Sequence, residues 1–135
     1  MLEMALTIPM LLLVCVGIFE FGRAYQTWQI MTNAAREGAR LAVLPSANEA
    51  AVKQRVKDYL KAGQLGAYAS ATVTLDPTAD INIGTGTANA SIVTVQYPFK
   101  FAVLGPIAKL VDPSSSFGTA MTLKTSAEMR NESQF

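Results

Sequence analysis

Histidine is absent from the 135-residue chain, and cysteine occurs once, as Cys15. Without histidine the chain lacks the commonest general base and the commonest metal ligand. A single cysteine cannot form a disulfide within the chain, and Cys15 lies in an apolar stretch, where a small hydrophobic residue is expected to be chemically inert. Neither a structural zinc site nor a set of nucleophile, base and orienting group can be assembled. The sequence therefore predicts no cofactor, no metal and no enzymatic activity.

Charge is scarce as well. Only 16% of the residues are charged, and the net charge at pH 7 is +1. Proteins that bind nucleic acid carry a strongly basic domain or patch, so no nucleic-acid partner is expected. The basic cluster Lys53, Arg55, Lys57 and Lys61 is better explained as the solvated face of a helix.

The most informative feature that is present is an uncharged stretch, Met4–Phe19, directly preceded by Glu3. As a helix this stretch would be roughly 24 Å long, somewhat short of the ~30 Å hydrocarbon core of a bilayer. Phe21 and Tyr25 extend the apolar face beyond it. No basic segment precedes the stretch and no small-residue cleavage site follows, so we expect a retained membrane segment and not a cleaved secretory signal.

A helix-compatible pattern continues through charged residues to about residue 44, where Leu44-Pro45 should end it. We therefore expect residues 1–44 to form one stalk helix, of which residues 1–25 would lie in a membrane or a filament core. Pro9 should kink or loosen the helix near its start. Residues 45–135 are expected to form a globular head.

Within the head, an amphipathic pattern predicts a helix over residues 48–63, with Val52, Val56, Tyr59 and Leu60 on its apolar side. Alternating patterns predict strands over residues 71–75, 91–104 and 119–130. Loops are expected at 76–89, with a possible short extended piece at 81–83, and at 105–117. Pro98 suggests that the second strand is an edge strand or has a bulge.

The predicted fold class is α+β: a long N-terminal membrane or filament-core α-helix plus a small head with one helix packed on a three- to four-stranded antiparallel sheet.

Three parts of the sequence resemble the TadE-like proteins, the minor pilins or pseudopilins of tight-adherence pili within the type IV filament superfamily. The first is EMALTIPMLLL at residues 3–13. The second is FEFGRAY at 19–25 running into NAAREGAR at 33–40, and the third, weaker, is VQYPF at 95–99 with SAEMR at 126–130. The family has an acid at the fifth position of the mature chain, whereas in this sequence the acid is the third residue.

The resemblance implies a structural pilin-like subunit. Such a subunit is held in the bacterial cytoplasmic membrane and then polymerises through its N-terminal helix into an extracellular pilus of the tight-adherence type. The implied partners are other copies of this chain or related pilins, a prepilin peptidase that removes a leader, and an assembly platform. The alternative is a non-polymerising, membrane-anchored scaffold or initiation component of a pilus or secretion machine.

The candidate assembly residues are Glu3, Pro9, Leu12, Leu13, Glu20, Arg23, Arg36 and Arg40. An acid at the head of an apolar helix is costly in lipid unless it has a partner. Glu3 is expected to pair with the terminal amine of a neighbouring subunit, or else to be a charge that flanks the membrane. Leu12 and Leu13 mark the middle of the apolar stretch.

Glu20 and Arg23 are three residues apart on one helix face. They can form an ordinary ion pair within the helix or an intersubunit bridge, for example from Glu20 to Arg36 or Arg40 of another copy. Arg36, Glu37 and Arg40 can equally well anchor the head on its own helix. The sequence leaves these alternatives open.

Overall fold

The computed structural model of the chain describes residues 2–84, 86–114, 116 and 119–131. The chain divides into two compact units, residues 1–27 with 99–121, and residues 28–98 with 122–135. Helix α1 continues from the first unit into the second, as strand β2 does from the second into the first. The predicted boundary at residue 44, between stalk and head, stays a prediction.

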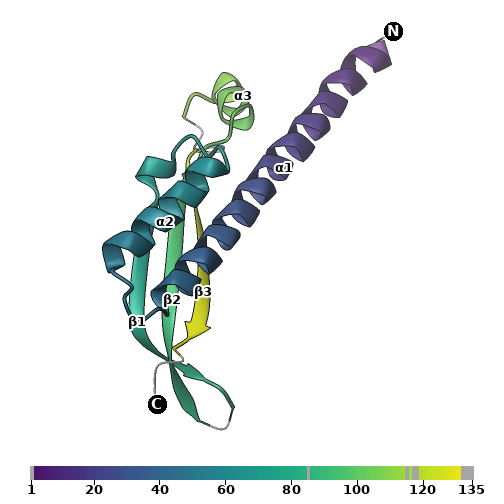
Figure 1. The fold of residues 1–135 in the computed structure, drawn as a ribbon. Coiled ribbons are helices and arrows are strands. Elements are labelled where there is room, and N and C mark those ends of the chain that lie inside the picture. Colours follow the sequence, from purple (N-terminus) through teal and green to yellow (C-terminus); the bar gives the residue numbers. More distant parts are fainter. Residues whose placement is uncertain (1, 85, 115, 117–118, 132–135) are drawn as a thin grey trace. The chain divides into compact units, whose positions relative to one another are not determined.

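Helix α1 spans Leu2–Ala42 without a break (Figure 1). Alanine, leucine, methionine and glutamate, which favour the helical state, are frequent in it. Pro9 lies inside the helix, where it removes the hydrogen bond to the carbonyl of Ala5, and helical structure continues on both sides of it. The prediction of one long N-terminal helix is confirmed, with its end at Ala42 shortly before the predicted Leu44.

Three strands form one sheet in the order β1-β2-β3: β1 is Thr72–Asn82, β2 is Thr87–Phe99 and β3 is Met121–Arg130. β1 and β2 are antiparallel and pair Val73 with Val95 and Leu75 with Val93. β3 lies on the other side of β2 (Figure 1). Together with the helices, this antiparallel sheet confirms the predicted α+β class.

The first hairpin is longer than the sequence predicted. Most of the expected loop at 76–89 is strand, because β1 continues to Asn82 and β2 begins at Thr87. Pairs such as Ile81 with Ala88 extend the ladder to the turn. Within the turn, Gly84 has φ +84°, a conformation that costs glycine little. The loop was predicted because Asp76-Pro77 and the many Gly, Thr, Asn and Asp residues after it are typical of turns. The expected extended piece at 81–83 is confirmed for Ile81 and Asn82, which belong to β1.

Pro77 interrupts β1 at a shift in register between Asp76 and Ala79. The side chains of two residues outside β1 compensate for this interruption. Ser91 Oγ donates to the Pro77 carbonyl at 3.5 Å, and Asn131 Nδ2 donates to it at 3.0 Å. The irregular part of the edge strand is therefore tied to β2 and to the end of β3.

The sheet order corrects the interpretation of Pro98. β2 is the central strand, so the prediction that it is an edge strand is wrong. Its pairing with β1 ends at Gln96, which lies opposite Thr72. Pro98 lies beyond that point, where its missing N–H costs no hydrogen bond to β1.

A second correction concerns the segment after β2. The strand ends at Phe99, not at Leu104, and Leu104–Val111 forms a third helix, α3, where a loop was predicted. Residues 115 and 117 of the predicted loop at 105–117 lie outside the described residues. Asp112 ends α3: its carboxylate accepts hydrogen bonds from the backbone and the hydroxyl of Ser114, in a turn that competes with a continued helix.

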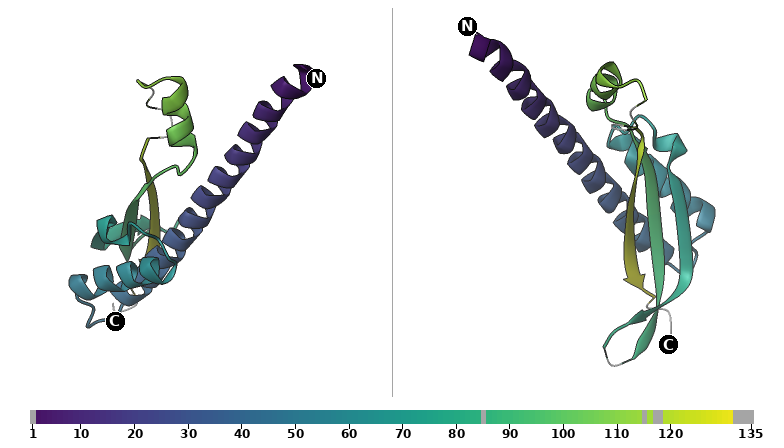
Figure 2. Two further views of the ribbon diagram at one scale, coloured as in Figure 1. Left: turned by 90° about the horizontal axis from the view of Figure 1, so that it is seen from above. Right: turned by 180° about the vertical axis from the view of Figure 1, so that it is seen from behind.

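Helix α2, Glu49–Ala62, covers one face of the sheet, as the view from behind shows (Figure 2). Its N-cap is Asn48, whose side chain accepts from the Ala50 amide at 3.1 Å. The apolar side chains Val52, Val56 and Leu60 are completely buried, as predicted, whereas Tyr59 is 39% exposed.

The second half of α1 packs against both α2 and the sheet through small residues. Ala34, Ala35 and Ala39 are completely buried. A Cβ atom added to Gly38 would lie 2.5 Å from Val56 Cγ2 and 3.2 Å from Val93 Cγ1. Glycine is therefore required at 38 by the close approach of α1 to both layers.

We expect Gly38→Val to destabilise the head by about 1–3 kcal/mol, because the added side chain overfills the contact with Val56 and Val93. Thermal unfolding of the purified protein, followed by circular dichroism in one detergent, measures the effect. Gly22→Val is the matched control on the same helix, since nothing lies within 4 Å of its Cβ position. Equal unfolding temperatures for the two variants would contradict the packing at Gly38.

Candidate functional site

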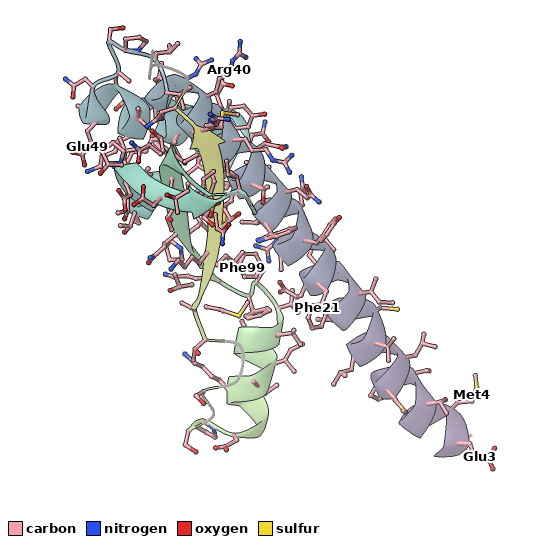
Figure 3. All side chains as sticks on the ribbon, turned by 90° about the horizontal axis from the view of Figure 1, so that it is seen from below. Glu3, Met4, Phe21, Arg40, Glu49 and Phe99 are labelled. Atoms are coloured by element: carbon pink, nitrogen blue, oxygen red, sulfur yellow. The ribbon has the colours of Figure 1, made fainter. Side chains whose placement is uncertain are left out.

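The N-terminal part of α1 exposes a continuous apolar surface. Its large side chains are exposed on all sides of the helix: Met4, Ile8, Met10, Leu11, Leu12, Leu13, Val14, Ile18 and Phe19. Leu12 and Leu13 are 58% and 59% exposed. Figure 3 shows the side chains of this part of the helix pointing away from its axis in every direction. A surface of this extent indicates contact with lipid or with other protein chains.

Two candidate residues lie near the start of this surface. Glu3 is exposed, and its carboxylate has neither a hydrogen bond nor an ion pair to any residue that the structure describes. Pro9 is exposed within the helix. The structure leaves the carboxylate of Glu3 available to a partner outside the described part of the chain.

Glu20, at the other end of the apolar surface, has the opposite environment. Its side chain is completely buried. One carboxylate oxygen accepts from Arg23 Nη1 at 2.7 Å, and the other accepts from the backbone amide of Val103. A carboxylate is tolerated out of water only when such partners are present.

Aromatic side chains complete this arrangement, which we call the Glu20 cluster: Glu20, Arg23, Phe99, Phe101 and Val103. The Arg23 guanidinium lies over the Phe99 ring, 5.3 Å from its centroid, in a cation–π contact. The Phe99 and Phe101 rings meet edge to face at a centroid distance of 5.3 Å. The side chain of Arg23 remains 37% exposed.

The position of Val103 explains why its amide is the donor. Val103 is the N-cap of α3, and the amides at the start of a helix have no partner within it. A negative charge is also favourable there because of the helix dipole. Glu20 therefore fixes the beginning of α3 to α1.

Of the two alternatives for Glu20 and Arg23, the structure contains the pair within the helix. Both oxygens of Glu20 already have partners in the chain. The contact with Val103 was missed, because α3 itself was not predicted. The signal was available in LGPIAKLV at residues 104–111, where apolar residues recur three and four apart with a proline near the start.

Arg36 and Arg40 lie on the second half of α1 and are exposed. The ion pair that joins this part of α1 to α2 is formed by neither of them, but by Glu37 and Arg55 at 2.9 Å. The hydrogen bond from Arg55 is the main cause that lowers the pKa of Glu37. An open groove is lined by Glu37, Arg40, Leu41, Leu44 and Arg55, so Arg40 borders this pair.

Among the described residues, no three histidine, cysteine, aspartate or glutamate side chains lie together as metal ligands would. Of the helices in that part of the chain, α1 is long and apolar enough to cross a membrane. The candidate site is therefore the exposed apolar surface of α1, which ends at the buried ion pair of Glu20 and Arg23.

Comparison with known proteins agrees with this description. The model of the TadE-like protein family matches residues 1–40. The match confirms the suspected resemblance over the apolar part of α1, the Glu20–Arg23 pair and the segment up to Arg40. It indicates a component associated with the tight-adherence pilus, and the long apolar helix is consistent with membrane anchoring. No curated protein and no solved structure matches the chain.

We expect Arg23→Met to loosen residues 99–111, because it leaves Glu20 buried with one partner fewer; the local opening free energy should fall by about 1–3 kcal/mol. Hydrogen exchange at the amides of 103–111 in detergent measures this loss. Lys53→Met is the matched control, since it removes a lysine that pairs with Glu49 at 2.6 Å on an exposed helix face, where such pairs contribute little. Unchanged exchange in the Arg23 variant would show that the cluster does not hold α3.

Proposed function

We propose that this chain is a structural, non-enzymatic subunit of a tight-adherence pilus, stored in the cytoplasmic membrane and polymerised through α1. The observation that carries the proposal is the exposed, uncharged helix surface over Met4–Phe19 in a segment that matches the TadE-like family. A helix that is apolar on every side needs surroundings that are apolar on every side. A bilayer and a bundle of identical helices both provide them.

The Glu20 cluster also supports the membrane stage. The uncharged stretch alone is roughly 24 Å long, which is less than the ~30 Å hydrocarbon core. Glu20, the next residue, is buried and paired, and Phe21 and Tyr25 are exposed. The bilayer can thin to match the shorter stretch, with Phe21 and Tyr25 at its boundary near Glu20 and the charged end of Arg23 extended toward the headgroups.

The filament stage requires the same surface to pack against other copies of the chain or related pilins. Leucine and methionine side chains can pack in many ways. The apolar segment alone therefore does not fix the axial register between neighbouring helices. Glu3, at its end, has no partner among the described residues. In our proposal it pairs with the terminal amine of a neighbouring subunit and fixes the register of the stack. A prepilin peptidase and an assembly platform are the further partners in this proposal.

Electron microscopy of sheared surface material, with mass spectrometry of the purified filaments, tests polymerisation. Filaments that contain this chain at a level expected for a subunit support the proposal. Retention of the whole pool in the membrane, in cells that do assemble pili, would instead indicate the non-polymerising scaffold.

Leu12→Lys should prevent both membrane retention and assembly. A lysine in the middle of the bilayer costs about 2.5–3.5 kcal/mol on insertion scales, and Leu12 lies in the middle of the exposed stretch. Leu12→Met, which conserves volume and polarity, is the control at the same position. Cell fractionation and the filament yield measure the two steps. Normal filament yield in the lysine variant would mean that the head drives polymerisation.

Glu3→Gln should leave membrane insertion intact and reduce incorporation into filaments, because it preserves shape and removes the charge that pairs with a neighbour. The variant is coexpressed with the parent chain, and the ratio of the two is measured in the membrane and in sheared filaments. Glu128→Gln removes the same charge from the exposed face of β3 and should incorporate normally. Equal incorporation of both variants would exclude the pairing role of Glu3.

A further inference from the structure

Helix α3 has an exposed apolar side. Leu110 is 86% exposed and Ile107 is 37% exposed, and residues three apart lie on the same side of a helix. Lys109 is exposed on a different side of the helix. An exposed apolar side of this kind is a candidate contact for a membrane or another protein.

The start of α3 is fixed at a defined height on α1. Its N-cap, Val103, donates its amide hydrogen to Glu20, and Glu20 directly follows the uncharged stretch Met4–Phe19. Any bilayer that accommodates this stretch has one of its surfaces close to Glu20. The hydrogen bond therefore holds the first turn of α3 at the boundary between hydrocarbon and headgroups.

We propose that α3 lies in the membrane interface before assembly, with Leu110 and Ile107 inserted among the lipid chains and Lys109 and Lys100 near anionic headgroups. This inference rests on the proposed membrane stage of the function. The occupant of the apolar side of α3 is the lipid bilayer that α1 already spans, so the two surfaces form one continuous interface.

The chemistry of the segment fits this environment. Interfacial helices combine aliphatic side chains with lysine or arginine and insert only to the depth of the headgroup–acyl boundary. Lys100 and Lys109 are exposed on the same compact unit as α1 residues 1–27. Phe21 and Tyr25 are exposed on α1 next to Glu20, and aromatic residues concentrate at this depth.

An isolated helix of this length would bind a membrane weakly, because its buried apolar area is small. The contact with Glu20 changes this, because a segment tethered at the interface is present there at a high effective concentration. The Glu20 cluster would thus have two roles. It buries and pairs a carboxylate at the end of the membrane segment, and it holds α3 close to the lipid surface.

The test uses the full-length chain with a single fluorescent label. Cys15 is the only cysteine, so Cys15→Ala provides a cysteine-free parent in which Leu110→Cys, Leu12→Cys and Ser126→Cys are labelled with an environment-sensitive dye. Leu110 and Ser126 are exposed, so neither label disturbs packing. The proteins are reconstituted in vesicles of phosphatidylcholine and phosphatidylglycerol that contain lipids with a quencher near the glycerol group or in the middle of the chain.

We expect the label at 110 to show blue-shifted emission and stronger quenching by the shallow quencher than by the deep one. The label at 12 should be quenched more by the deep quencher, and the label at 126 by neither. Replacing Lys109 with Gln should reduce the quenching at 110 in anionic vesicles and leave it unchanged in vesicles of phosphatidylcholine alone.

The outcomes separate the inference from the function on which it rests. Deep quenching at 12 with no more quenching at 110 than at 126 would overturn the interfacial position of α3 and leave membrane anchoring intact. Blue-shifted emission at 110 without quenching would also overturn it, because a protein surface, such as a second copy, would then cover α3. No quenching at 12 would exclude the membrane stage itself.

Discussion

The unbroken backbone of α1 is the constraint on which the rest of the structure depends. From Leu2 to Ala42 one helix is apolar and exposed over its first part and closely packed through small residues over its second part. The helix therefore contributes residues to both compact units, 2–27 to one and 28–42 to the other. Small residues at Ala35, Gly38 and Ala39 allow α1 to approach both Val56 of α2 and Val93 of β2 closely.

Glu20 lies where these two parts of α1 meet. A charged side chain at that position would normally limit the apolar segment to the residues before it, because an exposed carboxylate holds water around it. Hydrogen bonds from Arg23 and from the Val103 amide replace that water. The Phe99 ring lies against the Arg23 guanidinium and is itself packed against Phe101. These contacts offset the free-energy cost of burying the Glu20 carboxylate. They also hold the segment around Val103, which is distant in the sequence, against α1.

The elements that the sequence predicted well are those with a strong apolar period. Helix α2 with Val52, Val56 and Leu60 and the alternation in β3 were recognisable because burial of one face imposes the pattern. The first part of α1 was recognisable from its uninterrupted apolar composition instead. The part of the β1–β2 hairpin beyond Asp76-Pro77 was predicted as a loop, because turn-forming residues outnumber the few apolar ones, such as Ala79 and Ile81, that alternate within it. Helix α3, Leu104–Val111, was not predicted either: its apolar residues recur three and four apart, but the Pro-Ser-Ser-Ser run that follows them favoured a loop.

For the candidate site residues, too, local features could be predicted from the sequence and long-range contacts could not. The exposure of Leu12 and Leu13 follows from local composition, and so does the i,i+3 pair of Glu20 with Arg23. The contact of Glu20 with Val103 joins residues that are 83 positions apart, and no local pattern predicts such a pairing. The sequence suggested Arg36, Glu37 and Arg40 as anchors for the head, and of these Glu37 forms the ion pair with Arg55. Spacing along one helix identified the right turn of α1 but could not choose among the three residues.

The two acids that flank the apolar segment are thus unequal, and this difference bears on assembly. If both were unpaired, a stack of helices could satisfy them in more than one register, and each would also oppose storage in lipid. Glu20 has its partners within the chain, so it favours no particular neighbour. Among the described residues, Glu3 has none, and we infer that it is the acid free to select a position along an adjacent helix. In the function we propose, one paired and one unpaired carboxylate would allow the same apolar surface to rest in a membrane and then to pack in a single register.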